Sequence, residues 1–312
     1  MKRLNDENVR GVQGSAQGSA RRANPCAPSV RLAFAAVLLL AAVPASAAPA
    51  TATAPATAIT LAPHRAVYDL KLQKTRGSRP LEAVRGRILY DFSGNRCEGY
   101  ELKMRQVSEL DSGEGRSALT DLRSTTWEDG AGRSFRFSSE NRMNDRTVET
   151  VSGNAKRSEK GIAVVLEKPK PTNFEIPPAA VFPSEHMSRI VAAAQSGKTL
   201  VEVPTFDGSD NGRKVYNTLT VIGKPLAPDA HKPDDASASL PQLADMRRWP
   251  VTISYFDRDK ADRTGEQMPV YTLQFELFEN GISRALVLDY QDFVLSGELT
   301  SLDLLKPKPC KE

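Results

Sequence analysis

The side chains with the most evident chemistry in this sequence are its cysteines, Cys26, Cys97 and Cys310. If the chain is exported, Cys26 leaves with the leader, and the other two remain in an oxidising compartment. An even number of cysteines there favours a disulfide, and two buried free thiols are the alternative. A zinc site is not favoured, because two cysteines so far apart lack the spacing of zinc ligands.

One short segment has the composition of a metal site. Residues 207–212 (DGSDNG) imitate the opening half of a calcium-binding loop. The twelfth position of such a loop needs a bidentate Glu, but here it is Thr218, and Lys214 adds a positive charge. A polar turn between two strands explains the same residues. We therefore predict no metal ion and no cofactor.

The remaining candidates for catalysis are three histidines, since histidine is the usual acid–base group near neutral pH. His64 lies at a segment boundary, His186 in the first turn of a predicted helix, and His231 in a proline-rich loop. The sequence contains no nucleophile, zinc-protease or phosphate-loop motif. We predict no catalytic residue and a protein that is not an enzyme. The two tryptophans, Trp127 and Trp249, are expected to pack in the core or at its rim.

The first 47 residues are typical of a secretory signal peptide. Six basic side chains precede an apolar run at 32–43 (LAFAAVLLLAAV), and the triplet Ala45-Ser46-Ala47 follows. A basic region, a short apolar core and a small-residue cleavage site are the parts of such a leader. The run is shorter than the roughly 20 residues that cross a bilayer. The sequence therefore predicts a periplasmic protein that is soluble and lies close to a membrane.

Removing this leader changes the charge of the chain. The leader takes six basic and two acidic residues with it, so the 42 basic and 38 acidic side chains become 36 of each. The exported chain is then neutral, and the apparent basicity no longer points to a polyanion. We expect no nucleic-acid partner.

After an Ala/Thr/Pro-rich linker at 48–62, side chains alternate between apolar and polar. The alternation at residues 65–73 and 99–107 is that of half-buried strands, and it recurs most strongly in the last third, at 251–256, 270–278 and 284–295. Asn280-Gly281 is a hairpin signal, and we also expect turns at residues 93–95 and 152–154. These patterns predict roughly 11 to 14 strands.

A single segment, residues 183–196, has helical spacing instead. Its apolar side chains Met187, Ile190, Val191 and Ala194 recur three and four residues apart. Residues 224–244 are rich in proline and are expected to form a long surface loop. We predict one domain at 63–312 that is mainly β with some helix (α+β): an antiparallel sheet whose concave side is covered by the helix.

Five separated segments of the sequence carry a resemblance to a known family. They are 63–70 (PHRAVYDL), 90–92 (YDF) with 97–100 (CEGY), 206–216 (FDGSDNGRKVY), 249–257 (WPVTISYFD) and 286–299 (LVLDYQDFVLSGEL). In this order they resemble the EipB family of periplasmic cell-envelope integrity proteins, over about residues 61–310. The resemblance implies a single strongly curved, spiral-like β-sheet, an interior helix and a disulfide between Cys97 and Cys310. It also implies a role in maintaining the envelope under stress.

The function predicted from the sequence is therefore non-enzymatic support of envelope integrity through binding. The partner would be an envelope protein or a lipid component, and no ligand-binding residue can be assigned. One alternative is a carrier of lipid or lipoprotein with a pocket in the curved sheet. The other is a weak glycan or peptidoglycan hydrolase, because two well-placed carboxylates are enough for that chemistry.

Overall fold

The structure, a computed structural model, describes residues 59–76, 81–113, 115–228, 234–260, 267–307 and 309–310. Contacts divide the chain into two units, Met1–Ala54 and Pro55–Glu312, and the described residues belong to the second. The predicted signal peptide, 1–47, and residues 48–58 of the predicted linker lie outside them.

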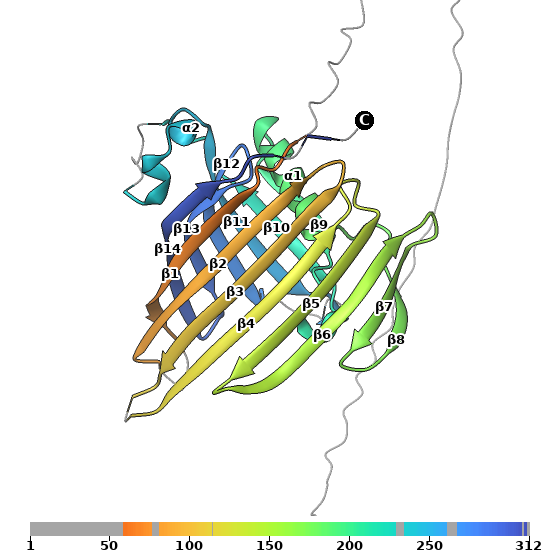
Figure 1. The fold of residues 1–312 in the computed structure, drawn as a ribbon, viewed down its shortest axis with the longest axis horizontal. Coiled ribbons are helices and arrows are strands. Elements are labelled where there is room, and N and C mark those ends of the chain that lie inside the picture. Colours follow the sequence, from red (N-terminus) through yellow and green to blue (C-terminus); the bar gives the residue numbers. More distant parts are fainter. Residues whose placement is uncertain are drawn as a thin grey trace, which may run out of the picture. The chain divides into compact units, whose positions relative to one another are not determined.

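Fourteen strands and two α-helices account for most of the described residues (Figure 1). The strands are β1 (His64–Thr75), β2 (Ala83–Asn95), β3 (Gly99–Asp111), β4 (Ser117–Glu128), β5 (Ser134–Met143), β6 (Arg146–Arg157), β7 (Ile162–Lys168), β8 (Thr172–Ile176), β9 (Leu200–Thr205), β10 (Tyr216–Ile222), β11 (Arg248–Asp257), β12 (Tyr271–Phe278), β13 (Ser283–Asp289) and β14 (Phe293–Leu304). The helices are α1 (Pro183–Gln195) and α2 (Pro241–Ala244), with short 3₁₀ turns η1 (Asp210–Gly212), η2 (Ala236–Ser239) and η3 (Arg258–Lys260).

All fourteen strands belong to one antiparallel sheet with the order β8-β7-β6-β5-β4-β3-β2-β1-β14-β13-β12-β11-β10-β9. Every neighbour is also a neighbour in sequence except β1 and β14, which pair at the middle of the sheet. The edges β8 and β9 are therefore consecutive in the chain, and α1 lies on the connection between them. Figure 1 shows β1–β6 in front of β9–β12, so the sheet curls back toward itself.

The alternation predicted from the sequence sets the two faces of this sheet. On β1, the side chains of Ala66, Tyr68 and Leu70 are buried. Arg65 and Lys71, on either side of this set in the sequence, are exposed. The buried set joins the largest hydrophobic core cluster, which also contains α1 residues. We call this side of the sheet the inner face and the opposite side the outer face.

Helix α1 covers part of the inner face, as the sequence predicted. Ile190, Val191 and Ala194 of its apolar stripe are buried, and Met187 is partly buried against the same core. The helix contacts β9 and β10. The predicted fold class is therefore confirmed: a curved antiparallel sheet with one substantial helix on its concave side.

The two edges of the sheet approach each other without becoming a hydrogen-bonded barrel. Val181 and Thr205 form an isolated bridge between the segment after β8 and the end of β9. Phe206, directly after β9, packs edge-on against Phe135 and Phe137 of β5, with ring centroids 6.2 and 5.5 Å apart. The curl is thus fixed mainly by apolar side chains.

Two expectations about segment boundaries need correction. The predicted linker extended to residue 62, but Leu61 is 3% exposed and packs with Phe92. The predicted turn at 152–154 lies inside β6 instead. A Cβ atom on Gly153 would lie 2.7 Å from the ring of Phe137, so this glycine makes room for an aromatic side chain rather than for a turn.

The predicted surface loop at 224–244 is attached to the sheet by buried charges. Arg284 on β13 donates from Nε to Asp235 Oδ2 at 2.6 Å and from Nη1 to Glu276 Oε2 at 2.6 Å. Glu276 also accepts from Arg248 at 2.9 Å. The proline-rich segment therefore ends in an anchored turn, η2, rather than in a free loop.

No described helix combines the length and the apolar composition that crossing a membrane requires.

Candidate binding site

Cys97 lies in the turn between β2 and β3, and Cys310 lies beyond β14. Asn95 Oδ1 shapes that turn by accepting from the backbone N–H groups of Cys97 and Glu98, both at 2.8 Å. The structure bonds the two sulfur atoms, with Cα atoms 5.6 Å apart, a separation within the usual range for a disulfide. Formation of the bond in the exported protein stays a prediction, which is taken up in the Discussion.

Residues 207–212, which resemble the start of a calcium-binding loop, form a turn that packs against the sheet. Asp207 Oδ1 accepts from the backbone N–H and the hydroxyl of Ser209, at 2.9 and 2.7 Å, which closes a local turn. Cβ atoms on Gly208 and Gly212 would lie within 2.5 Å of Phe137 and Leu166, so the turn sits directly on β5 and β7. Among the described residues, no group of three or more His, Cys, Asp or Glu side chains could hold a metal ion.

The two described histidines are buried and structural. His64 Nδ1 lies 2.8 Å from the Ala62 carbonyl oxygen, and burial lowers the pKa of this imidazole. His186 lies in the first turn of α1 with its ring nitrogens 3.4 Å from the hydroxyls of Thr205 and Thr218, and burial lowers its pKa to about 4. Both rings are therefore neutral near pH 7. His231 lies outside the described residues.

The tryptophans have packing roles, as expected. Trp249 is 2% exposed in the main core, whereas Trp127 is half-buried with the Arg136 guanidinium 4.3 Å above its ring.

A buried carboxylate begins helix α1. Glu128, at the end of β4, is 3% exposed, and its two oxygens accept from the backbone N–H groups of Ser184 and Glu185 at 2.6 and 2.8 Å. Phe182 at the N-cap position has no side-chain oxygen, so Glu128 satisfies the helix start from another strand. It lines a depression of about 290 Å³ beside Gly130, Gly132 and Arg189.

Burial raises the pKa of Glu128 to about 7, from 4.5. An acid with a raised folded-state pKa stabilises the fold fully below the unfolded-state pKa and loses that contribution as pH rises through the folded-state value. We therefore expect the free energy of unfolding of the wild type to fall, relative to that of Glu128→Gln, by up to about 3 kcal/mol from pH 5 to pH 8. Urea unfolding at several pH values measures it, with Glu175→Gln on exposed β8 as control. A pH-independent difference would contradict the expectation.

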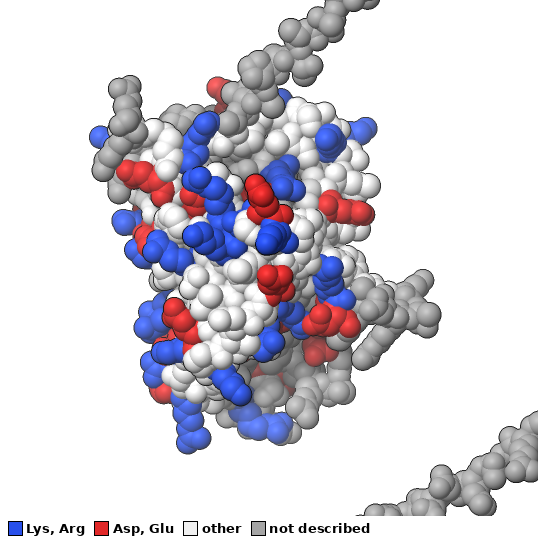
Figure 2. Space-filling model, turned by 90° about the vertical axis from the view of Figure 1, so that its right-hand side faces the viewer, with Lys and Arg blue, Asp and Glu red and all other residues white. Residues whose placement is uncertain are grey.

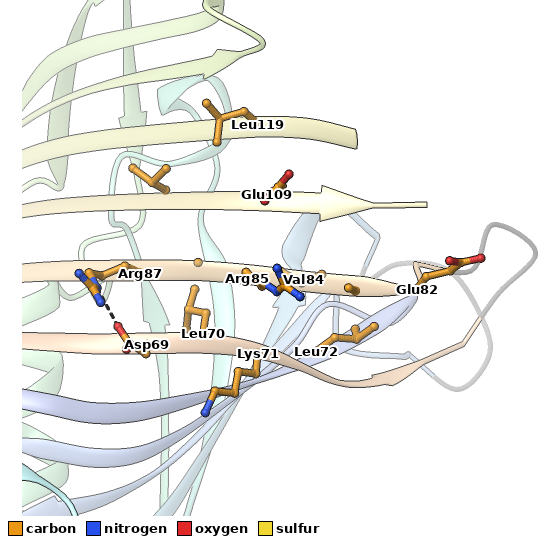
Figure 3. Close-up of a pocket in the computed structure, with 13 residues that line it drawn as sticks. Asp69, Leu70, Lys71, Leu72, Glu82, Val84, Arg85, Arg87, Glu109 and Leu119 are labelled. Atoms are coloured by element: carbon orange, nitrogen blue, oxygen red, sulfur yellow. Dashed lines mark hydrogen bonds and ion pairs between the residues drawn. The ribbon is translucent and has the colours of Figure 1, made fainter. Parts of the chain in front are cut away.

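A depression with a volume of about 680 Å³ lies over β1 to β4 (Figure 3). Charged side chains of the outer face line it, and several pair across strands: Arg87 donates to Asp69 at 2.7 Å. Beside them, Leu119 is 43% exposed. On the face shown in Figure 2, basic and acidic side chains are interspersed, and the whole sequence has 42 basic and 38 acidic residues.

The inner face contains a row of aromatic rings that crosses adjacent strands. The ring centroids of successive members are 5.1–5.9 Å apart, close to the spacing of neighbouring strands. We call this set the tyrosine row. It consists of Tyr216, Tyr255, Tyr271, Tyr290 and Phe293.

The ends and the middle of this row differ in their hydrogen bonds. Tyr216 donates to the carboxylate of Asp210, and Tyr290 bonds to Gln106 of β3. Within the part of the chain that the structure describes, the hydroxyls of Tyr255 and Tyr271 have no hydrogen-bond partner. Burial raises the pKa of both phenols, so both stay protonated and able to donate.

The inner face of β3 to β5 carries half-buried polar side chains among apolar ones such as Met104 and Leu122. Gln106, Ser124, Thr126, Ser139 and Asn141 share the parity of buried Phe135 and Phe137, yet each is only half-buried. Inward-pointing side chains that remain partly exposed indicate an inner face that solvent can reach. Small polar side chains there can donate and accept hydrogen bonds.

Sequence reasoning did not find this surface. The notable sequence signal is the frequency of tyrosine near the ends of strands at 255, 271 and 290. Alternation shows that these side chains share a face with the core, but only the strand order brings them into one row. The outer depression depends on register in the same way, since its lining residues come from β1 to β4.

Comparison with known proteins gives consistent matches. Residues 55–306 match the family described as EipB-like. The cell envelope integrity protein EipB of Brucella abortus (strain 2308) is 37% identical over 247 residues, which is 79% of this chain and 85% of that protein. The crystal structure of a beta-barrel-like protein of the domain of unknown function DUF1849, from Brucella abortus, has a TM-score of 0.73 at 34% identity. The match covers 80% of this chain and 100% of the Brucella abortus chain.

Proposed function

This chain belongs to the EipB-like family, and from that premise we propose that it supports the integrity of the cell envelope by binding another envelope component. The leader at 1–47 would export it to the periplasm, residues 48–58 would link it to the cleavage site, and the sheet would act there as one domain closed by Cys97–Cys310. The name of the Brucella relative supports the envelope role.

The observation that carries the binding function is the tyrosine row. A tyrosine hydroxyl that water reaches can exchange that water for a ligand group that donates or accepts a hydrogen bond. Tyr255 and Tyr271 present two hydroxyls without a partner among the described residues, on an inner face that solvent reaches. These two hydroxyls are suited to bind a polar ligand whose own groups replace the water molecules around them.

A lipid carrier is less well supported than a polar binding surface. A pocket for acyl chains is lined by apolar side chains, and burying an alkyl chain against unpaired hydroxyls costs free energy. The half-buried inner face here instead presents hydroxyl and amide groups such as Ser124, Asn141 and Gln106.

Complementation tests this proposal. Cells that lack the protein should become sensitive to detergent, and the wild-type gene should restore resistance. A Tyr255→Phe/Tyr271→Phe variant, which keeps the rings, should be secreted and folded but fail to restore it. The matched control is Arg85→Gln/Leu119→Ser in the outer depression. Full resistance in cells without the protein would refute the envelope role, and rescue by the Tyr→Phe variant would refute the inner face as its site.

A further inference from the structure

A second depression lies on the outer face, over β14 and β1 to β4, and has a volume of about 480 Å³. Basic side chains line its β3 and β4 end, where Lys103, Arg105 and Arg123 are all exposed. It shares no lining residue with the depression that contains Leu119. We call it the basic depression.

The register of the sheet places two arginines of this depression side by side. Arg105 on β3 lies directly opposite Arg123 on β4, and like charges in such positions repel each other. Asp121 lies between them: Arg105 donates to its two oxygens from Nε and Nη2, both at 2.9 Å, and Arg123 donates from Nη2 at 2.8 Å. These bonds lower the pKa of Asp121, so one negative charge is shared by two positive ones.

This arginine pair retains both charge and hydrogen-bond donors. Neither Nη1 group has a hydrogen-bond partner among the described residues. The other acids nearby have cations of their own, because Glu140 lies 3.9 Å from Arg142 and Glu101 lies 2.9 Å from Lys103. One excess positive charge therefore remains at this end, and guanidinium groups keep it at any physiological pH.

The opposite end of the basic depression is acidic but distant. Arg65 and Asp91 pair with each other there at 2.8 Å, which leaves Asp303 of β14. Asp303 is three strands from Arg105 in the sheet order, or about 14 Å at the usual strand spacing. Salt screens exposed charges over such a distance, so Asp303 does not cancel the charge of the arginine pair.

The floor between the two ends is apolar. Val67 on β1 lies opposite Leu89 on β2, and Leu89 lies opposite Arg105. Leu89 is 45% exposed although it is apolar. An acidic group held by the arginine pair would therefore place the adjoining part of its molecule over Leu89.

The number of cationic groups favours one class of acid. A phosphate monoester presents three terminal oxygens to Lys103, Arg105 and Arg123, whereas a carboxylate presents two, and the arginine fork matches phosphate geometry. We propose that the basic depression binds a phosphate monoester that carries an apolar substituent. Arg105 and Arg123 hold the phosphate, and Leu89 contacts the substituent. The site lies on the outer face and goes beyond the proposed function, which concerns the inner face.

Calorimetric titration of the purified exported protein with hexyl phosphate, inorganic phosphate and hexanoate tests this proposal. Hexyl phosphate should bind most tightly. Arg105→Gln/Arg123→Gln should weaken its binding by at least about tenfold, because charge-assisted hydrogen bonds are lost. Leu89→Ser, which leaves the arginine pair intact, should weaken the binding of hexyl phosphate severalfold and leave that of inorganic phosphate unchanged.

The matched control is Arg136→Gln/Lys156→Gln, which removes two exposed charges from β5 and β6 outside the basic depression. This variant should bind hexyl phosphate as the wild type does, and thermal unfolding checks that every variant is folded. The proposal is overturned if hexyl phosphate does not bind, if hexanoate binds as tightly, or if the control loses as much affinity as the arginine variant.

Vesicle flotation distinguishes two sources of the phosphate. Vesicles of phosphatidylcholine are prepared with and without phosphatidic acid, a lipid with a phosphate monoester. If the protein floats only with phosphatidic acid, and the arginine variant does not float, the phosphate belongs to a lipid. If hexyl phosphate binds but no vesicle does, the ligand is a soluble phosphate ester.

Discussion

Replacing Cys97 or Cys310 with serine is expected to lower the free energy of unfolding by as much as about 5 kcal/mol. The two residues are 213 positions apart, so their bond closes a loop that contains most of the folded chain. In the chain-entropy account, a cross-link removes more freedom from the unfolded state as its loop becomes longer. It also holds the C-terminal segment against the turn after β2, next to the strand pair that joins the two halves of the sheet.

The double variant distinguishes loss of a bond from loss of two side chains. Both single variants remove the same disulfide, so their effects should be about equal, and Cys97→Ser/Cys310→Ser should be no less stable than either. Urea unfolding of the oxidised proteins measures all three. Strictly additive losses would contradict a shared bond, as would two alkylatable thiols in wild-type protein isolated from the periplasm.

Replacing Glu276 with alanine is expected to cost about 3–5 kcal/mol. Its Oε2 atom accepts from Arg248 at 2.9 Å and from Arg284 at 2.6 Å, and these side chains are only 2% and 8% exposed. Removing the carboxylate takes away the partner that two buried guanidinium groups share, and breaking a buried ion pair is costly. Arg284 keeps its bond to Asp235. The turn around Asp235 should loosen at the same time, because Arg284 also holds it.

An exposed carboxylate provides the control for this effect. Glu298 lies 3.4 Å from Lys71 on the outer face, with 59% and 68% of the two side chains exposed. Glu298→Ala should therefore change the stability by at most about 1 kcal/mol. If both variants unfold at the same urea concentration, the buried network contributes no more than a surface ion pair and the prediction is wrong.

Most of the fold could be predicted because its physical cause is local. Strict alternation within strands such as β1 and β11 records which side chains face the core, and the stripe of α1 records its buried side. The failures have tertiary causes. Gly153 suggested a turn, but β6 needs a glycine there to accommodate Phe137, and Leu61 joined the folded part because Phe92 covers it.

The site could not be predicted, because it is assembled from distant segments. Tyr255 and Tyr271 come from β11 and β12, and their register places them side by side. Gln106 reaches Tyr290 from β3, on the far side of the pairing between β1 and β14. Alternation gives the face of each side chain, but only the curl of the sheet brings these faces together.

Photo-crosslinking in intact cells tests most directly whether the inner face is the binding surface. Two leucines of β4 form a matched pair, since Leu122 points to the half-buried inner face and Leu119 to the outer depression. Each is replaced in turn by p-benzoylphenylalanine, and the cells that produce the protein are irradiated. The inner-face position should yield a covalent adduct with an envelope component, and the outer position should not. An adduct formed only from position 119 would contradict the account.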